Sequence, residues 1–188
     1  MAEPHSDGIF IGRSFLSPFA LAKVLGAFDR LAGRWTGSQA LGLLGRAGTT
    51  QIRATDIAAL AQLDEIRGVL APAALRWARD RGFRLSPAPH LQIFPVRMVG
   101  DAEAPAYQEP HVDSDASQVR PPICTNVFYA RVHAVQGGAL AARRGADLSD
   151  PVTVAPTPNT IVTFSGDRVH WVLPLTAGER LSVVINFY

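Results

Sequence analysis

The chain ends in Arg180-Leu-Ser-Val-Val-Ile-Asn-Phe-Tyr188, where β-branched and aromatic residues follow a charged one. This composition is typical of a buried β-strand. Because side chains alternate across a strand, we expect Arg180 and Ser182 to face the same side of a sheet. A guanidinium is a planar fork that matches a carboxylate, and a nearby hydroxyl can add a further hydrogen bond. The stretch therefore predicts a core strand that carries a carboxylate-binding site.

Similar short segments fill the second half of the chain. From residue 86 onward, Val, Ile, Thr and aromatic residues gather in runs that Pro, Gly, Asp and Asn interrupt. We predict strands at residues 90–97, 107–113, 123–132, 138–142, 152–155, 160–165, 169–173 and 181–187. About eight short strands after a helical start indicate a mostly β fold, with a double-stranded β-helix (jelly-roll) core braced by helices.

Helical signals dominate before residue 86. Ser17 followed by Pro18 is typical of a helix start, because the serine oxygen can accept from a free N–H and proline is tolerated in the first turn. Apolar residues at helical spacing follow, and Gly33 indicates the end of this first helix. The glycine-rich segment 37–50 predicts a loop or mobile segment.

Two further helices are expected in the first half. One opens at Thr55 or Asp56, and another begins around Pro72 and ends at Gly82. At 188 residues with 47% apolar content, the chain is expected to form a single domain, residues 1–188. In this interpretation the helical brace comprises residues 1–85 and the jelly-roll core residues 86–188.

Charge and cysteine content narrow the classes of partner and compartment. The formal charge is +2 and the arginines are dispersed, which argues against nucleic acid as a partner. Cys124 is the chain's single cysteine, so no internal disulfide can form and a reducing compartment is expected. The amino end lacks a secretory pattern, and no apolar run reaches the ~18 residues that span a bilayer. We therefore predict a cytoplasmic protein without a membrane partner.

Two histidines and an aspartate form a candidate metal site. His111 and Asp113 lie two positions apart, so a strand would project both to one face, and His170 follows after several predicted strands. Two imidazoles and one carboxylate are the ligand set of a non-haem Fe(II) facial triad. Structural zinc prefers a thiolate-rich shell, which a single cysteine does not supply. An H-x-D triplet alone is common, but its combination with His170 and the later Arg180 favours iron.

The second half of the chain resembles the Fe(II)/2-oxoglutarate-dependent oxygenases, with the pattern of the prolyl-4-hydroxylase-like branch. The resemblance covers residues 90–188 and includes a double glycine, Gly137-Gly138, before a short strand. The family's H-x-D, distal histidine and R-x-S motifs are met by His111, Asp113, His170, Arg180 and Ser182.

The resemblance implies a reaction and its co-substrates. Fe(II) would be chelated by the 1-carboxylate and 2-oxo group of 2-oxoglutarate, with the 5-carboxylate on Arg180 and Ser182. With dioxygen, oxidative decarboxylation to succinate and CO2 would drive the oxidation of a substrate C–H bond. Retention of Asp113 favours hydroxylation or desaturation over halogenation, since related halogenases free that position for chloride.

Two features depart from the family pattern. Many relatives place a tyrosine before H-x-D to bind the co-substrate carboxylate, and this chain has none in the corresponding strand. Gln92, Thr125 and Tyr129 are the candidate replacements. Segment 98–108 is longer than the family pattern leads us to expect, which indicates a lid or substrate loop.

The small chain, without a peptide-binding repeat or extra domain, favours a small-molecule substrate such as an amino acid or a natural-product intermediate. One alternative is a cupin-like metalloenzyme, a hydrolase or dioxygenase, that does not use 2-oxoglutarate. Another is a jelly-roll binding module with a vestigial site. A nucleic-acid dealkylase of the same superfamily is disfavoured by the dispersed arginines.

Overall fold

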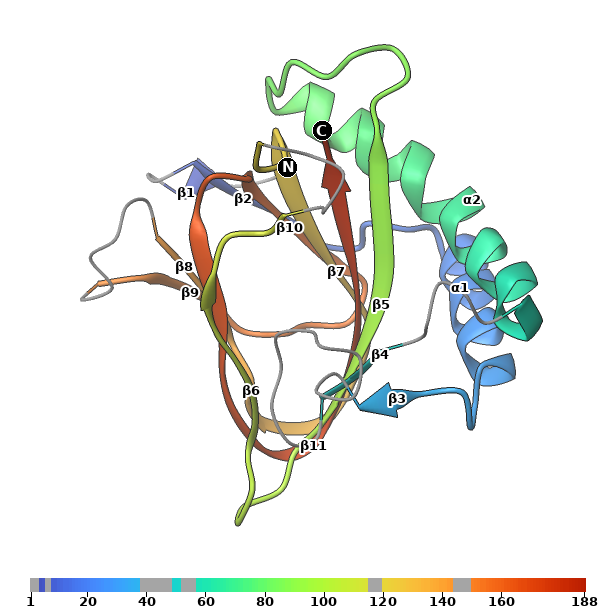
Figure 1. The fold of residues 1–188 in the computed structure, drawn as a ribbon, viewed down its shortest axis with the longest axis vertical. Coiled ribbons are helices and arrows are strands. Elements are labelled where there is room, and N and C mark those ends of the chain that lie inside the picture. The colour runs from blue at the N-terminus through green and yellow to red at the C-terminus, as the bar shows by residue number, and fades with distance from the viewer. Residues whose placement is uncertain (1–3, 6–7, 38–48, 52–56, 115–119, 144–149) are drawn as a thin grey trace.

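The described strands form one 11-stranded sheet that curls into a barrel, and two helices cover one side of it (Figure 1). We call its two facing parts the larger and the smaller sheet. The computed structural model describes residues 4–5, 8–37, 49–51, 57–114, 120–143 and 150–188. The larger sheet has the order β1 (Pro4–His5), β2 (Ile9–Gly12), β10 (Thr160–Ser165), β7 (Cys124–Gly137), β11 (Val169–Phe187), β5 (Leu91–Val99), β4 (Thr49–Gln51) and β3 (Thr36–Gly37). The smaller sheet contains β6 (Ala106–His111), β8 (Leu140–Arg143), β9 (Val152–Val154) and the first part of β11.

Strand β11 belongs to both sheets. Its first residues pair with β6 and β8, while its second part, from Glu179 onward, pairs with β5 and β7. Register shifts near Leu175 and Ala177 mark the bend between the parts. The two strands predicted at residues 169–173 and 181–187 are therefore one strand, because pairing partners continue through the bend. The mostly β, jelly-roll prediction is confirmed.

The second part of β11 separates two buried environments. One face packs against the helices through Leu181, Val183, Ile185 and Phe187. By strand alternation, the other face points into the barrel with Arg180, Ser182, Val184 and Asn186. Ser182 pairs in register with Tyr129, and the Tyr129 ring contacts the Arg180 guanidinium, which agrees with the prediction that Arg180 and Ser182 share one face.

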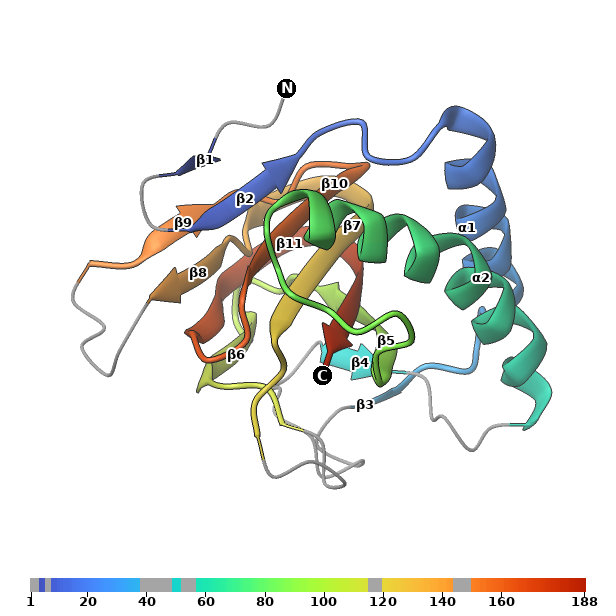
Figure 2. The same ribbon diagram turned by 90° about the horizontal axis from the view of Figure 1, so that it is seen from above.

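Helices α1 (Pro18–Arg30) and α2 (Ile57–Asp80) lie side by side on the outer face of the larger sheet (Figure 2). Ser17 caps α1 as predicted, and its Oγ accepts from the Ala20 N–H at 3.3 Å. Arg30 of α1 forms an ion pair with Glu65 of α2. Among the described residues, neither helix is long and apolar enough to span a membrane.

The predicted helix boundary at Pro72 is wrong. Helix α2 runs from Ile57 to Asp80 and contains Pro72 in its interior. An interior proline costs a helix about 3 kcal/mol. The helix continues because its buried face extends on both sides of the proline, through Ile66, Leu70, Ala74 and Ala78. The predicted start at Thr55 or Asp56 lies outside the described residues.

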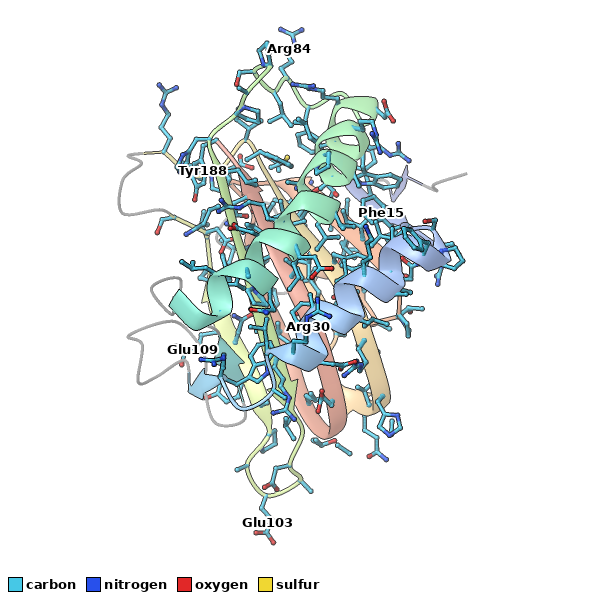
Figure 3. All side chains as sticks on the ribbon, turned by 90° about the vertical axis from the view of Figure 1, so that its right-hand side faces the viewer. Phe15, Arg30, Arg84, Glu103, Glu109 and Tyr188 are labelled. Atoms are coloured by element: carbon cyan, nitrogen blue, oxygen red, sulfur yellow. The ribbon has the colours of Figure 1, made fainter. Side chains whose placement is uncertain are left out.

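Two segments were predicted to be loops, 37–50 and 98–108. Only the ends of segment 37–50 are described, where Thr36–Gly37 pairs with Thr49–Gln51, and residues 38–48 lie outside the described residues. The segment 98–108 is not an extended lid, because its ends belong to β5 and β6 and only a short turn joins them. Figure 3 shows Glu103 of this turn at one end of the molecule and Tyr188 toward the other.

Candidate metal centre

The two candidate histidine ligands face each other across a pair of strands. His111 is the last residue of β6, and it pairs in register with His170, the second residue of β11. Their ring centroids lie 4.4 Å apart. Asp113 follows the end of β6, so the predicted strand 107–113 is two residues too long. Strand alternation therefore accounts for the placement of His111 but not for that of Asp113.

The three side chains nevertheless converge. One ligand atom from each of His111, Asp113 and His170 lies within 4.8 Å of the others. Nε2 of His111 lies 3.5 Å from Oδ1 of Asp113, and Nε2 of His170 lies 3.6 Å from Oδ2. Both imidazoles therefore direct the same nitrogen toward one carboxylate.

Backbone carbonyls fix which nitrogen of each imidazole carries the hydrogen. Nδ1 of His111 lies 2.7 Å from the carbonyl oxygen of Glu109, and Nδ1 of His170 lies 3.1 Å from that of Arg168. A carbonyl can only accept, so each Nδ1 donates. In the neutral imidazoles this leaves the Nε2 lone pairs available to a metal, an arrangement typical of ligating histidines.

Burial and mutual charge set the protonation states. Burial alone raises the pKa of Asp113, but the hydrogen bond with His111, the charges of both histidines and a hydrogen bond with Asn186 outweigh it. The pKa of Asp113 is therefore lowered. Burial is also the main reason that the pKa of His170 is lowered. For His111 burial lowers the pKa, but hydrogen bonds with Asp113 and the Glu109 carbonyl, together with the Asp113 charge, raise it overall. An anionic carboxylate beside a neutral His170 fits a divalent metal.

A buried arginine lies farther along β11. Arg180 is 2% exposed, its Nη1 donates to the Gly138 carbonyl at 2.7 Å, and its Cζ lies 4.9 Å from the centroid of the Tyr129 ring. Within the described part of the chain, Arg180 Nε and the Tyr129 hydroxyl have no hydrogen-bond partner. Burial lowers the pKa of Arg180. A buried cation without an anion is costly, so these groups fit a bound carboxylate.

The double glycine positions the carbonyl that accepts from Arg180. Gly137 and Gly138 have φ values of 82° and 70°, in the left-handed region that favours glycine. A Cβ on Gly137 would clash with the carbonyl oxygen of Pro174. The close approach of these two backbones therefore requires glycine beside the arginine.

The other candidate residues divide between two places. Ser182 pairs in register with Tyr129 beside Arg180, and its Oγ lies 3.4 Å from the Val96 carbonyl to which it donates. Thr125 lies at the metal centre, where its Oγ1 donates to Oδ2 of Asp113 at 3.3 Å. Gln92 pairs with Asn186, which in turn pairs with Thr125. Gln92 and Thr125 are therefore grouped with Asp113, whereas Tyr129 is grouped with Arg180.

Sequence reasoning missed Asn186 and Thr49. Asn186 is fully buried and belongs to the same alternating series as Arg180 and Ser182, so strand alternation could have identified it. Thr49 is 2% exposed, and it pairs with Met98, which pairs with Arg180. No sequence signal distinguished Thr49, because it lies at the end of a segment predicted to be a loop.

One interior joins the metal centre to the arginine. The ring of Phe164 lies 5.0 Å from that of His170, and Phe164 and Tyr129 belong to the same buried apolar cluster. Tyr129 in turn contacts Arg180. The interior of this jelly roll holds a His-Asp-His centre and a buried arginine. This combination is typical of non-haem metal enzymes that bind an anionic ligand.

Comparison with known families agrees with this class. Residues 98–188 match the family model described as the 2OG-Fe(II) oxygenase superfamily. The matched residues, just under half of the chain, contain the triad and Arg180. The match and the metal-centre geometry indicate a 2-oxoglutarate-dependent dioxygenase with Fe(II) and 2-oxoglutarate as cofactors. A search of curated protein sequences finds no match.

Solved structures show the same fold. A prolyl-4-hydroxylase from Pseudomonas putida is 20% identical, with 97% of this chain and 92% of that chain covered and a TM-score of 0.63. A prolyl hydroxylase from Trichoplax adhaerens, in complex with a hypoxia inducible factor peptide fragment, is 14% identical, with coverages of 97% and 84% and a TM-score of 0.66. The viral collagen prolyl hydroxylase of Paramecium Bursaria Chlorella virus-1, in a 2OG complex, is 12% identical, with coverages of 97% and 96% and a TM-score of 0.57.

Proposed function

We propose that the protein hydroxylates a C–H bond of a small molecule, such as an amino acid or a natural-product intermediate, with release of succinate and CO2. The observation that carries this proposal is the shared interior of the His-Asp-His centre and Arg180, which Phe164 and Tyr129 connect. A metal and a dicarboxylate co-substrate can occupy such an interior together.

In this proposal His111, Asp113 and His170 hold Fe(II), which with 2-oxoglutarate supplies the activation of dioxygen. Each histidine is oriented by a hydrogen bond from the ring nitrogen that does not face the metal. The carbonyls of Glu109 and Arg168 keep the Nδ1 hydrogens in place, so both Nε2 atoms remain ligands.

Arg180, Tyr129 and Ser182 would hold the distal carboxylate of the co-substrate. The hydrogen bond from Arg180 Nη1 to Gly138 fixes the guanidinium and leaves Nε available. The Tyr129 hydroxyl is a second donor that has no partner among the described residues. Tyr129 thus takes the role that relatives assign to a tyrosine elsewhere. The apolar walls around these groups, including Phe164, exclude water, which strengthens the charged contacts.

The test measures succinate formed from 2-oxoglutarate under air, with Fe(II), in the presence of individual free amino acids. We expect succinate formation to need Fe(II) and to rise with at least one free amino acid, whose mass increases by one oxygen atom. Arg180→Met should raise the 2-oxoglutarate concentration needed for half-maximal rate. Succinate formation that continues without Fe(II), or that Arg180→Met leaves unchanged, would contradict the proposed site.

A peptide substrate is the second candidate. It is favoured by the exposed apolar side chain of Val112, 38% exposed between two of the candidate ligands, and by Ile123, 40% exposed immediately before β7. The Trichoplax adhaerens structure contains a peptide fragment bound to its prolyl hydroxylase. Proline-containing peptides in the same succinate assay distinguish the candidates, since only one substrate class should stimulate turnover.

A further inference from the structure

Asp113 needs support from outside its own strand. It lies two residues past the end of β6, so no strand pairing holds its backbone. Its two carboxylate oxygens nevertheless face the two histidines at 3.5 and 3.6 Å. A carboxylate on such a segment keeps one orientation only when neighbouring side chains donate to it.

A row of polar residues on three strands supplies these donors. Asn186 of β11 pairs in register with Gln92 of β5 on one side and with Thr125 of β7 on the other. Asn186 and Thr125 are both 0% exposed. Directly paired residues share a face of the sheet, so this row points into the barrel toward the metal centre.

Hydrogen bonds connect the row to Asp113. Thr125 Oγ1 donates to Oδ2 of Asp113 at 3.3 Å, and the Asn186 side chain also forms a hydrogen bond with Asp113. Asn186 Nδ2 donates to Gln92 Oε1 at 3.2 Å. An ionised carboxylate can only accept, so the Asn186 amide must direct its nitrogen toward both neighbours. Gln92 thereby fixes the orientation of the amide that donates to Asp113.

We propose that Asn186 is a positioning residue, whose amide, aligned by Gln92 and assisted by Thr125, holds the Asp113 carboxylate toward the metal. The inference rests on the proposed role of Asp113 as a metal ligand. Residues that support a metal ligand typically contribute 10- to 100-fold to metal affinity, so loss of Asn186 should weaken metal binding by roughly that factor.

The chain offers a matched control on the opposite face of the same sheet. Asn126 of β7 is 0% exposed, its Nδ2 donates to the Ile185 carbonyl at 3.0 Å, and its Oδ1 accepts from Thr163 Oγ1 at 2.7 Å. Thr163 also accepts from Trp77 Nε1 of α2 at 2.8 Å, which places this pair on the helix side. An Asn and a Thr are thus buried and hydrogen-bonded on each face.

The experiment measures Mn(II) affinity by calorimetry, the visible spectrum of the Co(II) protein, and thermal stability. The interior variants are Asn186→Leu, Asn186→Ala and Thr125→Val, and the helix-side variants are Asn126→Ala and Thr163→Val. We expect the Asn186 variants to bind Mn(II) about 10- to 100-fold more weakly and to have an altered Co(II) spectrum. Thr125→Val should show a smaller loss, and the helix-side variants should lose stability while keeping wild-type affinity and spectrum.

Several outcomes would overturn the inference. Folded Asn186 variants that keep the wild-type Mn(II) affinity would do so. A Mn(II) affinity that falls in proportion to the loss of thermal stability in both the interior and the helix-side variants would do so as well. If an Asn186 variant fails to fold, the Thr125→Val variant provides the test. An unchanged Mn(II) affinity of that variant would contradict the proposal that this row of residues supports Asp113. A wild-type protein that binds neither metal would instead refute the proposed function itself.

Discussion

The two faces of the second part of β11 are both mostly buried but carry different side chains. On the helix side, Leu181, Val183, Ile185 and Phe187 are 0–2% exposed and pack into an apolar core. On the barrel side, Arg180, Ser182 and Asn186 are also 0–2% exposed. Burial alone therefore does not distinguish the scaffold from the site in this strand.

Hydrogen bonding does distinguish the two faces. On the helix side, Asn126 and Thr163 are connected to each other, and Trp77 donates to Thr163. On the barrel side, Arg180 Nε and Asn186 Oδ1 have no partner among the described residues. Buried polar atoms without partners are costly, so the barrel side is the face expected to receive ligands. Substitutions on the two faces should accordingly affect different properties.

The largest effect on stability is expected for a substitution on the helix-side face. Phe187→Ala removes a buried aromatic side chain from the core and should lower the free energy of unfolding by about 3–5 kcal/mol. The fraction that remains folded should bind Mn(II) normally. Urea denaturation measures the first quantity and calorimetry the second, and a loss of metal affinity at unchanged stability would contradict the division between the faces.

Arg180→Met tests the opposite face. The substitution removes a charge-assisted contact to the co-substrate and should weaken 2-oxoglutarate binding roughly 10- to 100-fold in calorimetry of the Mn(II) protein. Stability should stay the same or increase, because a buried cation without an anion is replaced by an apolar side chain. A marked fall in melting temperature would show that Arg180 serves the fold instead.

Acidification should weaken metal binding through His111. Its pKa is raised in the metal-free protein, so a proton competes with the metal as the pH falls toward and below that raised pKa. The lowered pKa values of Asp113 and His170 keep these groups in their ligand forms over this range. With one competing proton, Mn(II) affinity should fall up to about tenfold per pH unit below the raised pKa. Calorimetry at a series of pH values checks this slope, and a flat profile would exclude the competition.

The smallest effect concerns neither face of β11. Ser17→Ala removes the hydrogen bond that caps α1 and should cost about 1 kcal/mol of stability, measured by urea denaturation. Affinities for Mn(II) and 2-oxoglutarate should not change. A change in either affinity would link the helical brace to the interior in a way that this structure does not show.

Much of the candidate site could be predicted because it depends on residue type and on strand alternation, which are both visible in the sequence. His111, Asp113, His170 and Arg180 were named as candidates from their order, and alternation placed Ser182 beside Arg180. Asp113 was predicted to lie on the strand of His111, whereas it follows the end of β6, because pairing between β6 and β11 decides where the strand ends. The separation of Tyr129 from Thr125 also required the register with β11, including its shift between Leu181 and Ser182.

The fold, like the candidate site, could be predicted only in the parts that local sequence determines. The jelly roll could be predicted because its strands carry strong local signals. The continuity of α2 through Pro72 could not, because it depends on a buried face that only packing against the sheet creates. Local signals thus predicted the strands after residue 86 but not β1–β4, which lie in the half predicted to be helical and join the sheet of the core strands. Tertiary contacts decided where the predicted elements end.

The most direct test of the shared interior is the affinity for 2-oxoglutarate measured by calorimetry with and without Mn(II). If the metal centre and Arg180 bind one molecule between them, Mn(II) should strengthen 2-oxoglutarate binding in the wild type. His170→Ala should abolish that gain, and Arg180→Met should weaken binding even with the metal present. Equal 2-oxoglutarate affinity with and without Mn(II), or no binding in either case, would contradict the account.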